Sequence, residues 1–252
     1  MRRKWIALRK GAVFIMTILG LDTSAGAASV AVCDQTGVLG EFFINTKLTH
    51  SQTLMPMVQS LFENAQLSLE QIDVFAVSCG PGSFTGLRIG IAAVKGMAMA
   101  TGKPCAAVST LHALAYNLRG VEGIVCAAMD ARCEQVYTAL FRAQDGELLR
   151  LTEDSAITLI ELSRQLTQFS QPIFLVGDGA SLCYNKLNSE IASLRLAPNH
   201  LVFQRASSVC ALAATQVLSG NTQTAASLAP AYLRLPQAER ELRARQGADQ
   251  TK

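Results

Sequence analysis

The chain has 252 residues, of which 50% are hydrophobic and 16% charged, so it is long enough for one large or two small globular domains. No run of 18 apolar residues is free of charge, which argues against a membrane-spanning helix and a membrane role. The formal net charge is +3, but five basic residues in the first 15 positions leave −2 for the remainder. The folded part therefore has no general basic excess for gripping nucleic acid by itself.

The seven cysteines are scattered, with no CxxC pair and no Cys/His cluster. An odd number of cysteines in apolar runs favours reduced core thiols in a cytoplasmic protein. The three histidines, His50, His112 and His200, have no histidine partner three or four residues away. No serine or cysteine lies in a recognisable nucleophile motif. The sequence therefore predicts no metal, no cofactor and no catalytic residue.

Residues 1–15 are basic and end in a short apolar run, and they allow two interpretations. A basic segment before an apolar run is typical of a signal peptide. The apolar run, however, continues through Ile18–Leu21 into Asp22, as a first β-strand would. We favour a disordered or mis-assigned extension, with Met16 as the real start.

Two parts of the chain, residues 18–37 and 124–146, share one pattern. Each has an apolar strand ending in aspartate (Asp22 and Asp130), a short turn, an alternating strand and an Asp/Gly hairpin turn. Further matching strands follow in each part, at 38–45 and 73–82 in the first and at 148–151 and 172–180 in the second. The repeat predicts an α/β protein of two lobes related by internal duplication. Duplicated RNase H-like lobes are typical of the actin-like ATPase (ASKHA) superfold.

Helices are expected between these strands. Residues 49–65 carry an apolar stripe of period 3.6, with Pro56 expected in or near the first turns, and residues 207–218 form another amphipathic helix. The expected divisions are a first lobe over 16–108 with 207–236 packing back onto it, a second lobe over 109–206, and a polar tail over 237–252.

The stretch from Ser78 to Gly96 is unusually rich in small residues. Gly80-Pro81-Gly82 ends a buried strand, and Ser83 or Thr85 can cap the helix that follows. Two rows of mostly small residues lie at helical spacing, namely Gly86, Gly90, Ala93 and Met97, and Ala92, Gly96 and Ala100. Each interior glycine costs a helix ~1 kcal/mol relative to alanine, and close approach of another segment is the usual compensation. This helix lies deep in its own domain or docks onto another protein.

The two repeated aspartates suggest a nucleotide cleft, because in this superfold such aspartates face a central ATP site. Asp22, Thr23, Ser24 and Asp130 are the candidate residues. No lysine or arginine occurs between Met16 and Thr46, and GPGSFTGLRIG lacks the phosphate-loop spacing and its lysine. We favour inherited turn geometry without ATP chemistry, although a helix N-terminus there could still bind an anion.

Four segments carry a family resemblance: ILGLDTS at 18–24, HSQTLMPMV at 50–58, GPGSFTGLRIGIAAVKGMA at 80–98 and PAYLRLPQAE at 230–239. In this order they resemble the TsaB (YeaZ) family, from Met16 to about Glu239. The resemblance implies a non-catalytic paralogue of TsaD that acts in N6-threonylcarbamoylation of adenosine 37 in tRNAs reading ANN codons. It further implies a heterodimer with TsaD, joined by the ATPase TsaE, and contact with tRNA only through that complex.

The resemblance also bears on metal chemistry. TsaD carries a metal on an HxxxH pair that aligns with Thr110 and Leu114 of this chain, while His112 falls between them. The resemblance therefore implies that this chain lacks the metal and the transferase chemistry. A free-standing actin-like ATP-dependent kinase and an M22-type peptidase are the alternatives, and each needs charged or metal-binding residues that the sequence does not reveal.

In the resembling family, the helix after His50 and the helix after Gly82 pair with TsaD, or with a second copy when TsaD is absent. The resemblance thus implies a partner-binding surface on these two helices. The candidate contacts are Met55, Gln59, Gly82, Ser83, Phe84, Thr85, Gly86, Arg88 and Gly90.

Overall fold

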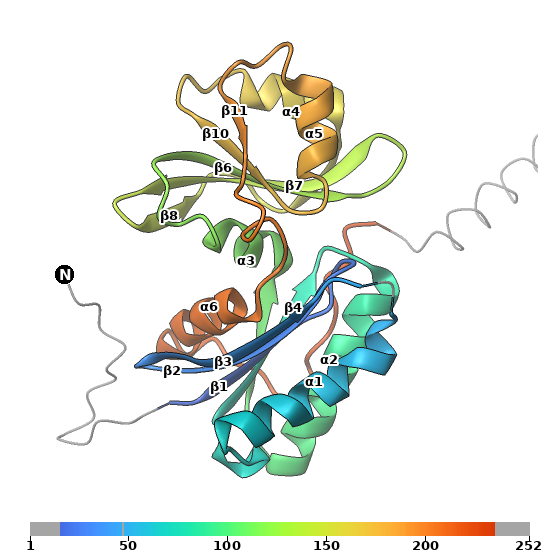
Figure 1. Cartoon of the computed structure of the whole chain (residues 1–252), viewed down its shortest axis with the longest axis vertical. Coiled ribbons are helices and arrows are strands. Elements are labelled where there is room, and N and C mark those ends of the chain that lie inside the picture. Colours follow the sequence, from blue (N-terminus) through green and yellow to red (C-terminus); the bar gives the residue numbers. More distant parts are fainter. Residues whose placement is uncertain (1–15, 47, 235–252) are drawn as a thin grey trace, which may run out of the picture.

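The structure is a computed structural model that describes residues 16–46 and 48–234 (Figure 1). It has two lobes, each built on a mixed β-sheet with helices on both faces, which confirms the predicted α/β class. The expectations for the extension over 1–15 and for the tail over 237–252 lie outside the described residues.

The first lobe contains a five-stranded sheet in the order β3-β2-β1-β4-β5. Its strands are β1 (Ile18–Asp22), β2 (Ala28–Asp34), β3 (Gly37–Ile44), β4 (Val74–Gly80) and β5 (Cys105–Ser109). The first three form an antiparallel meander, whereas β4 and β5 run parallel to β1. The carboxyl ends of β1 and β4 therefore meet at one edge of the sheet.

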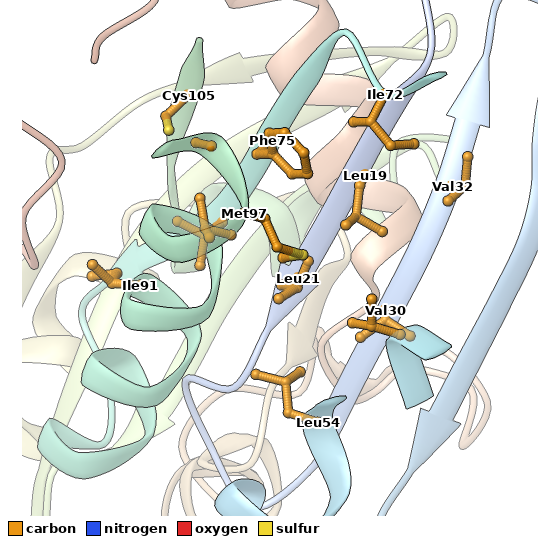
Figure 2. Close-up of a cluster of buried hydrophobic side chains, with 14 of the residues drawn as sticks. Leu19, Leu21, Val30, Val32, Leu54, Ile72, Phe75, Ile91, Met97 and Cys105 are labelled. Carbon is orange, nitrogen blue, oxygen red and sulfur yellow. The ribbon is translucent and has the colours of Figure 1, made fainter. Parts of the chain in front are cut away.

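Helices cover both faces of this sheet. On one face lie α1 (His50–Ala65) and α2 (Phe84–Thr101), and on the other lies α6 (Ala206–Leu218). The short 3-10 turn η1 (Leu69–Gln71) follows α1 along the chain and precedes β4. Figure 2 shows the core between the sheet and α1 and α2, where Leu19, Leu21 and Phe75 are fully buried. Burial of apolar surface here is the main force that fixes both helices on the sheet.

The second lobe contains a sheet in the order β11-β10-β6-β7-β8, with β9 also paired to β7. Its strands are β6 (Gly123–Asp130), β7 (Gln135–Gln144), β8 (Glu147–Arg150), β9 (Ser155–Thr158), β10 (Ile173–Val176) and β11 (Leu194–Leu196). On one face lie α4 (Leu159–Leu166) and α5 (Ala180–Leu187), and on the other lies α3 (Thr110–Tyr116).

The two lobes exchange helices. The chain leaves the first sheet through β5, yet α3 packs Leu111 and Leu114 into the core of the second lobe. It leaves the second sheet through β11, yet α6 packs Val209 and Ala213 against the first sheet. Both helices lie between the two sheets and touch each other (Figure 1). The core of each lobe is therefore completed by a helix that follows the last strand of the other lobe: α3 follows β5 and packs on the second sheet, and α6 follows β11 and packs on the first.

The predicted repeat is confirmed strand by strand. Both β1 and β6 end in an aspartate, each pairs with an antiparallel neighbour, and each has a parallel partner, β4 or β10, that arrives later in the chain. The predicted helix over 49–65 is α1, capped at Thr49, and that over 207–218 is α6. Pro56 lies in the second turn of α1, within the expected first turns, and its ring removes one backbone donor on an exposed side of the helix.

Leu21→Ala should lower the free energy of unfolding by about 2–5 kcal/mol, because the fully buried side chain leaves a cavity in the first core. Urea unfolding followed by circular dichroism measures the change. Leu149→Ala is the matched control: Leu149 is 60% exposed on β8, and its loss should stay within about 0.5 kcal/mol of wild type. Equal effects of the two substitutions would contradict the assigned core.

Candidate functional site

The turn between β4 and α2 brings the glycine-rich segment against the end of β1. The Ser83 side chain caps α2 by accepting a hydrogen bond from the Gly86 N–H at 3.2 Å, while the Ser83 N–H donates to the Ser24 carbonyl at 2.7 Å. Thr85, the other candidate cap, is exposed on the first turn of α2. The start of α2 is thus tied to the β1–β2 turn.

The first row of small residues faces the inside of the lobe. A Cβ atom on Gly90 would come within 2.5 Å of the Thr23 Oγ1, and one on Gly86 would clash with the Thr23 carbonyl. The Thr23 hydroxyl donates to the Gly86 carbonyl at 2.7 Å. Gly82 packs in the same way against Ser24. These three candidate contacts therefore serve packing within the first lobe, since Gly86 and Gly90 are buried there.

Other residues of α1 and α2, which lie side by side on the first sheet, are exposed (Figure 1). We call these residues the helix-pair surface, made of Met55, Gln59, Ala92, Gly96 and Met99. Met55 is 47% and Met99 72% exposed. The Gln59 amide donates a hydrogen bond to Glu63 of its own helix at 2.8 Å. Met99 was not predicted, although an apolar residue off the core stripe of α2 is the signal that could have found it.

Phe84 and Arg88 already have partners within the chain. The Phe84 ring stacks on Tyr232 with centroids 4.7 Å apart, and the Arg88 guanidinium lies 3.9 Å from the Phe84 centroid. The Arg88 Nε also donates to the Tyr232 hydroxyl at 2.9 Å. Arg88 nevertheless stays exposed beside the helix-pair surface.

A cleft of about 700 Å³ lies between the lobes. Its walls come from the β1–β2 turn and the start of α2, from the β6–β7 turn and Asp178, and from residues 231–234. Two of the predicted cleft residues, Ser24 and Asp130, line it. The structure thus brings both repeated turns to one cavity, as the duplication predicts.

Asp22 is fully buried, and its carboxylate is already satisfied. Ser24 donates to Oδ1 from its backbone N–H at 2.9 Å and from its hydroxyl at 2.7 Å, and the Ser78 hydroxyl donates to Oδ2. Burial raises the pKa of Asp22, and the serine hydrogen bonds act in the opposite direction. Asp22 therefore holds the β1 and β4 ends together instead of facing a ligand.

The second-lobe side of the cleft carries carboxylates. The Asp130 Oδ1 accepts the Arg132 N–H at 2.7 Å, and the Asp130 N–H donates to Asp178 at 3.4 Å. Partial desolvation between the cleft walls, with the Asp130 charge adding to it, raises the pKa of Asp178 to about 6. The charged residues that line the cleft balance, because Arg132 and Arg234 also line it, so the cleft has no cationic excess for the triphosphate of ATP.

The positions aligned with the metal pair of TsaD are unsuited to a metal. Thr110 and Leu114 are fully buried, and His112 stacks on Phe141 with ring centroids 5.2 Å apart. Burial and the nearby Arg150 lower the pKa of His112 to about 4. Within residues 16–46 and 48–234, no group of three or more His, Cys, Asp or Glu residues could hold a metal ion.

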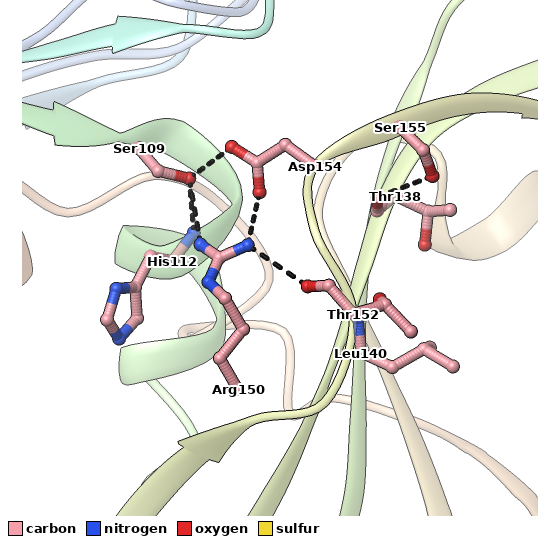
Figure 3. A network of polar contacts seen from close by, with 8 residues as sticks. All are labelled: Ser109, His112, Thr138, Leu140, Arg150, Thr152, Asp154 and Ser155. Carbon is pink, nitrogen blue, oxygen red and sulfur yellow. Dashed lines mark hydrogen bonds and ion pairs between the residues drawn. The ribbon is translucent and has the colours of Figure 1, made fainter.

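Beside His112, a polar network joins the end of β5 to the second lobe (Figure 3). The Ser109 hydroxyl donates to Asp154 at 2.6 Å, and the Arg150 guanidinium donates to the same carboxylate at 2.6 Å. The His112 N–H donates to Ser109 at 3.2 Å. This network anchors α3 and has no open coordination position.

The two duplicated lobes and the cleft between their aspartate-bearing turns define the class of the protein, which is a two-lobed α/β protein of the actin-like ATPase superfold. Residues 37–242 match the family model described as TsaD: tRNA N6-adenosine threonylcarbamoyltransferase. The chain belongs to the family that this match describes and, within it, to TsaB (YeaZ), which confirms the resemblance carried by its four sequence motifs.

The chain resembles several named relatives. It is 32% identical over 222 residues to the tRNA threonylcarbamoyladenosine biosynthesis protein TsaB of Escherichia coli, covering 87% of this chain and 95% of that protein. It is 34% identical over 167 residues to TsaB of Bacillus subtilis, covering 66% and 73%. The solved structure of YeaZ from Pseudomonas aeruginosa aligns with a TM-score of 0.71 at 31% identity, covering 86% of this chain and 100% of that one.

A comparison of two glycines of α2 tests their opposite surroundings. Gly90→Ala should lower the free energy of unfolding by about 1–3 kcal/mol, because the added methyl group overlaps Thr23. Gly96→Ala meets nothing within 4 Å and should raise it by up to about 1 kcal/mol, because alanine favours the helix. Urea unfolding measures both, and a stabilising Gly90→Ala would refute the packing role of Gly90.

The pH dependence of stability tests Asp178. Its pKa is raised from the ordinary 3.8 to about 6 in the folded chain, so its ionisation opposes folding, and stability is lost as the pH rises through this interval. Asp178→Asn should therefore gain stability relative to wild type between pH about 4 and 6 and keep a constant advantage above. Urea unfolding at a series of pH values measures it. An advantage that does not change with pH would count against the raised pKa.

Proposed function

We propose that this chain is a partner subunit in tRNA threonylcarbamoyladenosine biosynthesis that binds a TsaD-type subunit and does not itself catalyse the transfer. The names of the similar proteins support the pathway. TsaE joining the pair, self-association in the absence of TsaD, contact with tRNA only through the complex, and a cytoplasmic location belong to the same proposal. In the described part of the chain, no helix has both the length and the apolar character to cross a membrane.

The helix-pair surface is the observation that carries this proposal. Two methionines from neighbouring helices are exposed there, and Ala92 and Gly96 leave the α2 backbone open to close approach. Flexible methionine side chains adapt to a partner, and small residues allow helices to pack at short distance. A stable interface needs about 1,200–2,000 Å² of total buried surface, which the length of two helices can supply.

The absence of transfer chemistry is supported by the cleft. The carboxylate of Asp22 accepts hydrogen bonds from Ser24 and Ser78. The charges that line the cleft balance, with two aspartates and two arginines: Asp130, Asp178, Arg132 and Arg234. Phosphoryl transfer needs cations or metal around the phosphates, and a metallopeptidase needs a ligand cluster. The kinase and peptidase alternatives are therefore less favoured than the subunit role.

Met99→Glu should abolish the complex with the TsaD-type subunit of the same organism, or weaken it at least about tenfold. The substitution introduces a charge that the interface would bury without a partner. Size-exclusion chromatography and isothermal titration calorimetry measure binding. Thermal unfolding of the free chain should stay near wild type, because Met99 is 72% exposed.

Ile160→Glu provides the matched control, since Ile160 is 67% exposed on α4 of the other lobe. It should leave binding unchanged. Undiminished binding by Met99→Glu would contradict the helix-pair surface as the interface. ATP turnover by the isolated wild-type chain would favour the kinase alternative.

A further inference from the structure

After α6, which already packs on the first sheet, the chain continues along the first lobe toward the cleft. Gln223 pairs with Cys105 of β5, and the Lys95 ammonium of α2 donates to the carbonyls of Ala226 and Leu228 at 3.3 and 3.0 Å. The Ala231 N–H then donates to the Cys79 carbonyl at 2.7 Å. This path delivers residues 231–234, which we call the strap, to the mouth of the cleft.

The contact between the strap and the end of β4 depends on the glycine at position 80. Gly80 has φ +131°, and a Cβ atom there would clash with the Ala231 carbonyl. The backbones of β4 and the strap can therefore approach this closely only because position 80 lacks a side chain. The strap is thus fitted to the end of β4.

An aromatic and cationic anchor holds the strap on α2. Tyr232 stacks on Phe84, and Arg88 both covers the Phe84 ring and donates to the Tyr232 hydroxyl. Stacked rings and a guanidinium over a ring face each add attraction beyond the apolar area that they bury. The anchor thus fixes the position of the next residues of the strap.

The strap ends on the second lobe. The Arg234 guanidinium donates to the Ala131 carbonyl, in the β6–β7 turn, at 2.7 Å. The donor is charged, and such hydrogen bonds are stronger than neutral ones. All four strap residues line the cleft, together with residues of both lobes. The strap therefore spans the mouth and links the lobes there.

The anchor also borders the helix-pair surface. Arg88 lies four residues before Ala92 on the exposed side of α2, so the two residues are neighbours on one helix face. We propose that the strap holds the two lobes together and that a partner docking on α2 releases it by taking over Arg88. The release step rests on the proposed function, whereas the strap itself is a property of the chain alone.

Cys79 is the reporter for opening of the strap, because its carbonyl accepts the Ala231 N–H and loss of this contact frees the end of β4. Its backbone carries the first strap contact, and burial together with the Asp154 carboxylate raises its pKa to about 11, so its thiol reacts slowly in the closed chain. The full chain is treated with iodoacetamide, and labelling is followed at each cysteine by peptide mass spectrometry. The exposed Cys133 provides the rate of an open thiol, and the buried Cys126 reports global unfolding.

Arg234→Ala and Tyr232→Ala should each speed labelling of Cys79 at least about threefold relative to Cys133, because a charge-assisted or stacked contact of this kind shifts an equilibrium by that factor or more. Tyr232→Phe keeps the stacked ring and loses only the hydrogen bond from Arg88. The rate of Cys79 labelling in this variant should therefore lie between those of wild type and Tyr232→Ala. Arg195→Ala is the matched control, because Arg195 also donates to backbone carbonyls, but only within the second lobe. This substitution should leave the rate of Cys79 labelling at the wild-type value.

If Cys79 labelling is unchanged in both alanine variants while Cys126 stays unreactive, the proposal that the strap holds the two lobes together is wrong. Addition of the TsaD-type subunit should speed Cys79 labelling in wild type and leave the already open Arg234→Ala chain unchanged. A partner that binds without changing the wild-type rate would overturn the release step. Failure to bind at all would contradict the proposed function, while the variants of the free chain still decide the strap.

Discussion

The contact between α2 and the turn after β1 is the constraint on which the other features depend. Three glycines, Gly82, Gly86 and Gly90, let the start of this helix and the turn before it lie directly on Thr23 and Ser24. The Thr23 hydroxyl and the Ser83 N–H then fix the helix in register with hydrogen bonds of 2.7 Å each. Because close-packed contacts leave little room for adjustment, they fix the position of α2 against this turn.

This single placement decides what each side of α2 does. Gly86 and Gly90, on the side of α2 that faces the lobe, are buried against Thr23, so only the exposed side of the helix is accessible to a partner. The first turn of α2 forms part of the cleft wall and carries Phe84, on which the C-terminal segment is seated. The same helix therefore carries the exposed Met99, lines the cleft and holds the contact between the lobes.

The local features of the fold were predictable from the sequence. The strands that end in Asp22 and Asp130 and the hairpins after them each depend on neighbouring residues in the sequence, and so does the apolar stripe of α1. Such local patterns can be recognised without knowledge of the fold. The side of α2 that faces the lobe was not predictable. Helical spacing shows that Gly86 and Gly90 share a face, but it does not say whether that face meets Thr23 or another protein.

Contacts between distant positions were equally hidden. Arg88 and Tyr232 are 144 positions apart, and nothing in either local pattern pairs them. The role of Asp22 was also open, because a strand-terminal aspartate suits a ligand site and a buried hydrogen-bond network equally well. Only the three-dimensional position of Ser78 decides between these roles.

The exchange of helices between the lobes has a consequence for how the chain is made. The second face of the amino-terminal sheet is covered by Val209, Ala213 and their neighbours on α6, which are synthesised after the whole second lobe. On the ribosome, the half that is translated first must therefore wait with one apolar face bare, and it reaches its final packing after the half that is translated later. Severing the polypeptide between the lobes would give two fragments, each lacking a covering layer, instead of two independent domains.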